Sequence, residues 1–558
     1  MKCLSPRNVA LGVILAAYLG SLCAGMSATQ PMVADEVVHY YMVLTQAKKL
    51  PAPNVSVEMP VRGRIHKRLY PHVFLWHYAG AVVWKFLGQA FWSVQIYHSL
   101  FWLQLLVSMW LLAKALRPGD AVVGLLNVVI LASLPMCLLF SVLLFQDLPA
   151  TAQVITSLMF LCRRQLWGSL VFMGIALSLK VTVFVFLPAY LFCIAAFFWR
   201  TERPWRTVLR LFMSVAIIVA MCAPMAMALH KLGWSYYPVV TTAQYLKRLG
   251  IIDKNNPVFR QGAIPVAAPN VVKNDNVDVI KPEICAHPGD LRIPVNWVLY
   301  FGGVFYVLVL FSIVGAILLR SRSQGILSRE ELCLTGAAIW ILAMTAYHMR
   351  TAPDARFFMP GVVILVLPLA RLASAVPWRR VWLPMLVAVA ALQTGVVLSK
   401  TASLRKISPA MQEAIDFTYT LGSYGNNNIF MYPEGHERFM GGSVEWYLGY
   451  ELRDLWRGNN DERIRLLQKY KTGVVIVKKN RIKAVSPDTV DLGVYPESFV
   501  NDIRQDPRFT KLFENSAVII FLVPGNGKST SGPAAVGQSV GTNGVSSARH
   551  PEQESGAQ

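Results

Sequence analysis

Long apolar runs recur through the first 400 residues of the chain, and they constrain its fold more than any other feature. A helix needs about 20 apolar residues to cross the hydrocarbon core of a bilayer. Of the 558 residues, 54% are hydrophobic and only 15% are charged, whereas soluble proteins carry about 25% charged residues. We therefore expect an α-helical polytopic membrane protein with about eleven transmembrane helices, near residues 8–28, 94–113, 121–140, 148–162, 166–180, 182–199, 207–228, 296–319, 331–348, 359–377 and 381–399.

Lysine and arginine residues give these spans an orientation. The net charge is +22, but no long basic arm or glycine-rich nucleotide loop accompanies it, so nucleic acid is not an expected partner. The basic residues gather instead beside the ends of apolar runs, and the positive-inside rule assigns that side to the cytosol. This group comprises Lys2, Arg7, Lys114, Arg117, Arg163, Arg164, Arg200, Arg203, Arg206, Arg320, Arg322, Arg379 and Arg380.

The same rule places other segments on the outer face. The run at 166–199 has basic residues at both ends, so it is predicted to cross twice, with Lys180 at the outer turn. Outer loops are then expected at 29–93, around Asp147, at 229–295 and at 349–358. The loop at 229–295 is rich in Asn and Pro, and loops of that length are usually functional or disordered.

Three units are predicted along the chain. Residues 1–400 form the transmembrane domain, and its first helix resembles a signal peptide but is interpreted as an uncleaved span. Residues 401–525 are interpreted as a soluble, non-cytosolic α/β domain, and 526–558 as a disordered tail without aromatic residues. Strands are predicted in "NIFMY", "GVVIVKK" and "SAVIIFLVP", and helices in "GSVEWYLGYEL" and "ERIRLLQKYK".

The eight cysteines do not form a disulfide or zinc pattern. Cys285 alone lies in a long polar loop, and no CxxC occurs. Neither a disulfide framework nor a zinc site is therefore expected. The other seven lie in or beside apolar runs.

Two acids and a histidine directly follow the first apolar run, in "PMVADEVVHYYM" (31–42). If this stretch is helical, Asp35 and His39 lie one turn apart on one face, and Glu36 neighbours that face. A carboxylate there could act as a general base towards a hydroxyl, with the histidine orienting it or contacting a phosphate. Two other interpretations stay open: the acids cap a helix N-terminus, or the motif binds a metal.

Two isolated charges interrupt later apolar runs at the outer face. Asp147, in "FQDLPA", is the only charge between two spans, and it is either a helix cap or an acid with a task at the membrane interface. Lys180, in "GIALSLKVTVFVFLPAY", either snorkels to lipid headgroups or holds a phosphate.

Basic residues on the outer side break the positive-inside trend. Arg350 and Arg356 lie in "YHMRTAPDARFFMP", and arginine forks suit phosphate oxygens, although a structural pair with Asp354 is the alternative.

The first outer loop carries "VRGRIHKRLYPHVFLWHY" (61–78), which is expected either to lie on anionic lipid or to line a site for a lipid-linked anion. Acids and cations on one face suit transfer from a lipid-phosphate donor, because cations neutralise the charge that grows on the leaving phosphate.

The order of these motifs resembles the GT-C superfamily of glycosyltransferases, multi-span enzymes that use polyprenyl-phosphate sugars. The resemblance covers about residues 8–400 and rests on the acidic motif, "YPH", "QDLPA", "GIALSLKVT" and "PDARFFMP". It implies that Asp35 is the general base, with Glu36 the other candidate, and that Asp147 positions the acceptor or the base. Transfer by single displacement would invert the anomeric centre.

The same resemblance implies a binding site for the donor phosphate, formed by Lys180 and Arg356 with Arg350 and His39 as further contacts. A divalent metal is not expected, although oligosaccharyltransferase members of the superfamily need one, and no other cofactor is implied. The partners implied are a polyprenyl-phosphate sugar, a lipid, glycan or protein acceptor, and membrane lipids. The enzyme would be a hexosyltransferase or a pentosyltransferase.

Individual motifs point to different branches of the superfamily. The Asp-Glu-x-x-His spacing is similar to the ER α-1,2-glucosyltransferases that act on the dolichol-linked oligosaccharide, whereas "QDLPA" resembles protein mannosyltransferase-like members. His98 stands where those members usually have arginine, and Ala355 where the glucosyltransferases have asparagine in Asp-Asn-Arg. The soluble domain fits bacterial members better. A bacterial inner membrane is therefore favoured, with a cytosolic N-terminus and a periplasmic C-terminal domain, while the sequon at 54–56 also allows the ER.

Two other classes of function stay open. The first is a transporter or flippase of lipid-linked sugars, although transporters usually carry charges near the bilayer midplane and show paired repeats. The second is a non-enzymatic envelope assembly protein whose 401–525 domain binds a partner.

Overall fold

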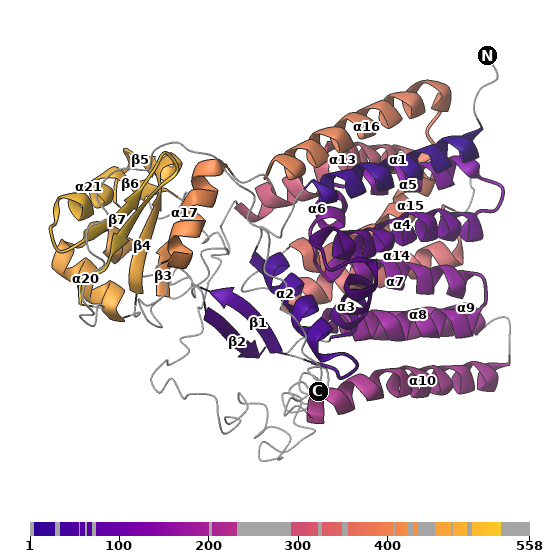
Figure 1. Ribbon diagram of the computed structural model, residues 1–558. Coiled ribbons are helices and arrows are strands. Elements are labelled where there is room, and N and C mark those ends of the chain that lie inside the picture. Colours follow the sequence, from indigo (N-terminus) through magenta and orange to yellow (C-terminus); the bar gives the residue numbers. More distant parts are fainter. Residues whose placement is uncertain are drawn as a thin grey trace.

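The computed structural model describes a helical bundle and a small α/β unit (Figure 1). The described residues are 5–27, 34–54, 56–61, 64–69, 74–199, 203–231, 292–321, 326–348, 355–404, 408–420, 428–431, 452–469, 472–487 and 494–525. Most of the predicted loop at 229–295 and the whole predicted tail at 526–558 lie outside them, as does nearly all of "GSVEWYLGYEL".

The bundle consists of helices whose positions match the apolar runs. Every predicted span coincides with one helix or with two consecutive short ones. The elements are α1 (Pro6–Met26), α3 (Leu75–Leu87), α4 (Phe91–Leu116), α5 (Ala121–Ser133), α6 (Pro135–Val142), α7 (Asp147–Cys162), α8 (Leu166–Leu179), η1 (Val181–Phe186), α9 (Leu187–Phe198), α10 (Pro204–Lys231), α13 (Arg292–Ser321), α14 (Arg329–His348), η2 (Ala355–Phe358), α15 (Met359–Ala373) and α16 (Arg379–Leu404).

Length and hydropathy identify fewer candidate membrane spans among the described helices than the sequence predicts. Six of the described helices are long and apolar enough to span a bilayer, and a seventh if α5 and α6, bent by 62°, form one span. Helices such as α8, with 14 residues, rise only about 21 Å against a hydrocarbon core of about 30 Å. The protein is therefore a multi-pass membrane protein, while the predicted number of about eleven crossings is not confirmed.

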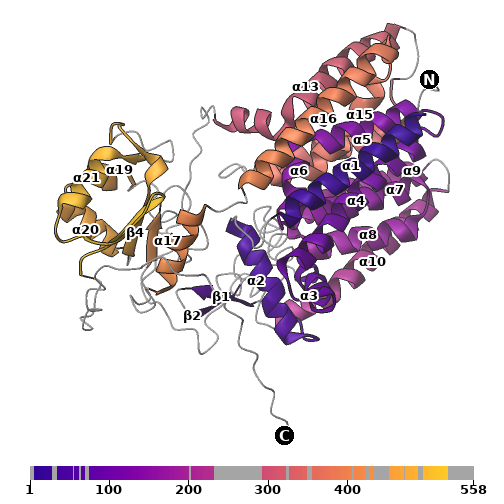
Figure 2. The same ribbon diagram turned by 45° about the horizontal axis from the view of Figure 1, so that its top comes forward.

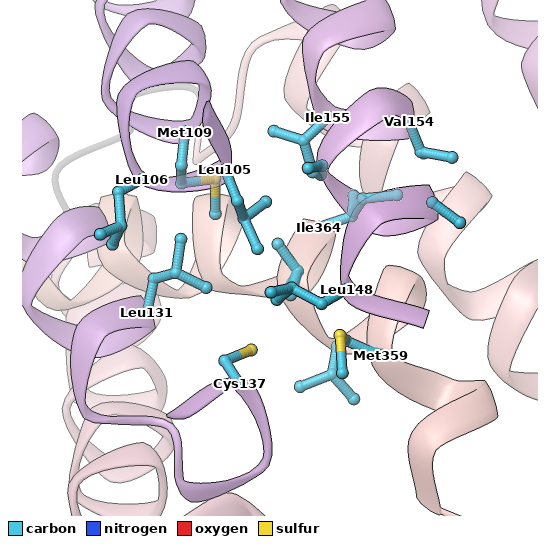
Figure 3. Packing of buried hydrophobic residues seen from close by; sticks show 14 of the residues in the cluster. Leu105, Leu106, Met109, Leu131, Cys137, Leu148, Val154, Ile155, Met359 and Ile364 are labelled. Atoms are coloured by element: carbon cyan, nitrogen blue, oxygen red, sulfur yellow. The ribbon is translucent and has the colours of Figure 1, made fainter. Parts of the chain in front are cut away.

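Apolar packing and polar pairs together hold the centre of the bundle. Figure 3 shows Leu105 and Met109 of α4 facing Leu148 and Ile155 of α7, with Ile364 of α15 beside them. On the same two helices, the amides of Gln104 and Gln153 bond reciprocally at 3.1 and 2.9 Å, and Ser108 meets Thr156 at 2.8 Å. Because apolar burial alone does not drive helix association in lipid, such pairs and close packing fix which helix faces meet.

Helix α16 supports two breaks in neighbouring helices. The α5–α6 break falls at Pro135, and α13 is kinked at Gly302, where φ is +73°. Gln393 donates to the Ser133 carbonyl oxygen at 2.8 Å and accepts from the Val304 N–H at 3.3 Å. Interrupted helices persist at membrane depth when a neighbour satisfies the freed backbone groups, as Gln393 does here.

The predicted outer loop at 29–93 is largely regular structure. It contains α2 (Ala34–Lys49), an antiparallel pair of strands, β1 (Ser56–Val61) and β2 (Arg64–Leu69), and α3. In both views α2 and the strand pair lie at one end of the bundle, on the side where the α/β unit is found (Figures 1 and 2).

The α/β unit contains a mixed four-stranded sheet of order β3-β4-β8-β7. Alternate residues of β4 face two hydrophobic clusters: Val475 and Val477 join one, Val474 and Ile476 the other. Both faces are thus buried, and the predicted strands at β3, β4 and β8 and the predicted helix at α20 are confirmed. The elements are α17 (Pro409–Thr420), β3 (Asn428–Met431), α19 (Leu452–Arg457), α20 (Asn460–Lys469), β4 (Thr472–Lys478), η5 (Lys479–Arg481), β5 (Ile482–Lys483), β6 (Tyr495–Pro496), α21 (Glu497–Gln505), β7 (Thr510–Glu514) and β8 (Val518–Leu522).

Candidate active site

The two ends of the bundle differ in their charged residues. At one end, Arg117 forms a bidentate pair with Glu331 at 3.0 and 2.7 Å, and Arg164 meets Glu330 at 3.1 Å. Ser328 and Glu331 cap the start of α14 reciprocally. Two basic groups that the positive-inside rule assigned to one side therefore do lie at one end, and the assignment of that end to the cytosol stays a prediction.

The opposite end collects the candidate site residues. Helices α4, α7 and α15 begin there, while α8 ends there. Consequently Asp147 at the start of α7, Lys180 after α8 and Arg356 before α15 share one end, as the orientation argument predicted. Helix α2, which carries Glu36 and His39, lies at this end too (Figure 2).

Asp147 and Lys180 form a direct ion pair between their Oδ1 and Nζ atoms. The side chain of Asp147 is 4% exposed and that of Lys180 is 15% exposed. Asp147 is the first residue of α7 and not its cap, which is Gln146. Lys180 is extended (φ −149°, ψ 129°) between α8 and η1, which confirms the predicted turn at this residue. The sequence predicts a role for each residue separately, whereas the structure joins the two in one ion pair.

Arg356 and Lys180 both lie against aromatic rings. The Lys180 ammonium is 4.7 Å from the Phe357 ring centre, and the Arg356 guanidinium is 5.1 Å from the ring centres of Phe357 and Phe145. Aromatic faces attract cations at these distances without neutralising them. Beside the Asp147–Lys180 pair lies a pocket with an otherwise mostly apolar lining, which includes Val154, Val183, Phe186, Ile341, Phe357 and Pro360.

Glu36 is completely buried and makes contacts that a helix cap would not. Its Oε1 lies 3.4 Å from Gln95 Nε2 of α4 and 3.3 Å from the backbone N of Leu144, between α6 and α7. These contacts tie α2 to two other parts of the bundle.

His39 belongs to a chain of polar side chains that the sequence analysis did not anticipate. Its Nδ1 lies 2.9 Å from Nε2 of His77 in α3, and His77 Nδ1 lies 3.5 Å from Nε2 of Gln146. Nearby, His98 Nε2 lies 2.7 Å from the carbonyl oxygen of Phe140. The missed residues had a signal: His77 interrupts the apolar stretch "VFLWHYAG", and Gln146 directly precedes Asp147.

The side chains of two predicted site residues, Asp35 and Arg350, lie outside the described part of the chain. The Asp35 backbone is part of α2, but its side chain is outside the described residues, as is all of Arg350. Among the described residues, no group of three or more His, Cys, Asp or Glu side chains is arranged to hold a metal ion.

Comparisons with known proteins give similar solved structures alone, since no family model and no curated protein matches. The chain is similar to the Archaeoglobus fulgidus oligosaccharyltransferase, with 14% identity and a TM-score of 0.48 over 84% of this chain and 69% of that one. It is similar to ArnT from Cupriavidus metallidurans bound to undecaprenyl phosphate, with 14% identity and a TM-score of 0.46 over 95% of this chain and 99% of that one.

A third similar structure is the arabinofuranosyltransferase AftD from mycobacteria. The identity is 14% and the TM-score 0.47, over 93% of this chain and 40% of that one, so the chain spans two-fifths of its length. Two of these structures are named as an oligosaccharyltransferase and an arabinofuranosyltransferase. All three likenesses lie below 25% identity and below a TM-score of 0.5, so the architecture described above rests on this chain's own helices.

Proposed function

We propose that the protein is a membrane glycosyltransferase that takes its sugar from a polyprenyl-phosphate donor. The proposal rests on one observation. Buried carboxylates, and cations that lie against aromatic rings, meet at one end of the bundle beside a mostly apolar pocket. Buried charges in a membrane protein are costly and mark functional sites by default.

Lys180 and Arg356 are the proposed ligands of the donor phosphate. Lys180 lines the pocket, and both cations lie near Phe357, which lines it too. A phosphate held by two cations is a better leaving group, because the charge that grows on it in the transition state is neutralised in place.

The acceptor hydroxyl is activated by a carboxylate in this proposal. The acceptor oxygen bonds to the anomeric carbon as the bond from that carbon to the phosphate oxygen breaks. The hydroxyl proton passes to the base, and the electron pair of the broken bond stays on the phosphate, so the configuration inverts. Asp35 is the leading base, because Glu36 is buried and its Oε1 already contacts Gln95 and the Leu144 N–H.

A donor hydrolysis assay tests this function without knowledge of the acceptor. The full chain in lipid nanodiscs is incubated with a panel of synthetic polyprenyl-phosphate hexoses and pentoses, with and without a membrane lipid extract, and released polyprenyl phosphate is measured. Wild type should release it from at least one donor. Asp35→Asn should lower the rate about 10²–10⁴-fold, the usual contribution of a general base.

The matched control is Glu497→Gln, which changes an exposed acid of the α/β unit. It should keep the wild-type rate. Release by Asp35→Asn at the wild-type rate would remove Asp35 as the base. If wild type releases no polyprenyl phosphate from any donor that it binds, the proposed transferase function is rejected.

A further inference from the structure

The segment between α6 and α7, residues 143–146, determines where Asp147 stands. We call it the connector. Helix α6 ends at Val142, Leu143 is extended (φ −87°, ψ 138°), and α7 begins directly after Gln146. Any displacement of the connector is therefore passed to Asp147 and, through the ion pair, to Lys180.

His98 of α4 holds the last turn of α6 just before the connector. Its Nε2 lies 2.7 Å from the carbonyl oxygen of Phe140. A carbonyl oxygen can only accept, so Nε2 of His98 must carry the hydrogen. The imidazole is fully buried and packs at right angles against Trp76, with ring centres 5.9 Å apart.

The connector itself is held from two further helices. The Leu144 N–H lies outside both α6 and α7, and it donates to Glu36 of α2. The Gln146 amide meets His77 of α3, which in turn meets His39. Two helices thus reach the connector, and a third reaches the last turn of α6 directly before it. They do so through side chains that are at most 1% exposed: Glu36, His77 and His98.

Burying these polar groups is expensive, and an apolar residue would pack there at lower cost. A buried polar group without a hydrogen bond costs roughly 1–3 kcal/mol in mutational data. Buried backbone groups outside helices, and the carbonyls of a helix's last turn, need partners as well. The Leu144 N–H and the Phe140 carbonyl find theirs in Glu36 and His98. These buried polar side chains are therefore found next to the segment that fixes the position of Asp147.

We propose that His98 and His77 are positioning residues that hold the connector and, through it, Asp147 and Lys180 in the geometry needed for transfer. This inference rests on the proposed function and deepens it. Neither imidazole is required to touch substrate. A misplacement of about 1 Å far from the chemistry can cost on the order of 10²-fold in rate.

The test compares variants that keep or remove the hydrogen bond. His98→Gln places an amide N–H near the position of Nε2, whereas His98→Leu removes the donor. His98→Leu should lower kcat for donor release about 10²-fold while KM for the lipid donor changes little, and His98→Gln should recover most of the rate. His77 meets Gln146 through Nδ1, which accepts from the amide. His77→Leu should therefore lower kcat, and His77→Asn, whose Oδ1 can accept near the position of Nδ1, should recover most of the rate.

A second measurement does not depend on activity. Hydrogen exchange at the amides of 144–147 should be faster in His98→Leu than in wild type, and close to wild type in His98→Gln. The matched control is Ser312→Ala, which removes a buried interhelical bond between α13 and α15, to the Leu369 carbonyl oxygen, and leaves the connector untouched. It should leave both kcat and connector exchange unchanged.

The outcomes separate the two proposals. If wild type releases no donor lipid, the proposed function fails, and the exchange rates still decide whether His98 holds the connector. If His98→Leu keeps wild-type exchange and kcat, or if His98→Gln is as impaired as His98→Leu in both, the positioning role is overturned.

Discussion

At the scale of single residues, Asp147 and Lys180 act as one unit, with consequences for both stability and activity. Taking two charges out of water costs several kcal/mol per ion, which their mutual attraction repays only when the pair is intact. A donor phosphate arriving beside Lys180 would meet a cation that is already engaged with Asp147. Removing one partner should therefore be worse for the fold than removing both.

A double-mutant cycle tests this expectation. Lys180→Met leaves the Asp147 carboxylate buried without its cation and should destabilise the protein by about 3–5 kcal/mol. Adding Asp147→Asn should recover most of that loss, although activity stays low. Thermal midpoints of the purified full chain, recorded at one scan rate, give the comparison. Equal midpoints for the single and double variants would contradict a buried, energetically coupled pair.

At the scale of helices, close approach of backbones decides which elements pack together. An ideal Cβ added at Gly315 of α13 would lie 1.7 Å from the carbonyl oxygen of Leu372 in α15. Ser312, one turn earlier, reaches the Leu369 carbonyl oxygen at 2.7 Å. Small residues allow such approach between membrane helices, so α13 and α15 depend on a residue without a side chain at this crossing.

Gly315→Ala should force α13 and α15 apart. Because the clash is with backbone and not with a flexible side chain, we expect a loss of about 1–3 kcal/mol or more. The matched control is Gly336→Ala in α14, where an added Cβ meets nothing within 4 Å. The thermal midpoint should fall for Gly315→Ala alone, because alanine has the higher helix propensity and costs nothing at an open helix position. An equal fall in both variants would contradict a special role for the α13–α15 crossing.

At the scale of the whole molecule, the bundle and the α/β unit use charge differently. The bundle buries the Asp147–Lys180 pair at one end, whereas several ion pairs of the α/β unit lie at its surface. Arg508 holds the pKa of Asp506 down at about 2, and Lys511, with Lys479, does the same for Glu514. The α/β unit should therefore respond to acid through these groups.

The direction of the pH effect follows from the lowered pKa values. Unfolded Asp and Glu have pKa values of about 3.9 and 4.3. These pairs therefore stabilise the unit fully above that range and lose their contribution as the pH falls towards 2. Pepsin cleavage within 452–525 of the full chain, followed by mass spectrometry, should rise between pH 4.5 and 2. Glu514→Gln should show a smaller rise than wild type at matched pH, and identical profiles would contradict the assignment to Glu514.

Much of the bundle could be predicted because membrane insertion is decided locally. The free energy of placing a window of about 20 residues in lipid depends on its own composition, so the predicted spans coincide with helices. The charge bias of loops is a local property too, and it correctly grouped Arg117 and Arg164 at one end and Asp147 and Lys180 at the other. The crossing number was less predictable, because α7, α8 and α9 are short.

The sequence by itself thus determined where the helices of the predicted spans lie, which ends they share, and that Asp147 and Lys180 meet at one end. Only the tertiary structure decided the partners: Asp147 with Lys180, Glu36 with the Leu144 N–H, and His39 with His77. The physical reason is that a contact between distant residues depends on the rotation and separation of two packed helices. That geometry is set by packing across the whole bundle, such as the Gly315 crossing, and no local pattern encodes it.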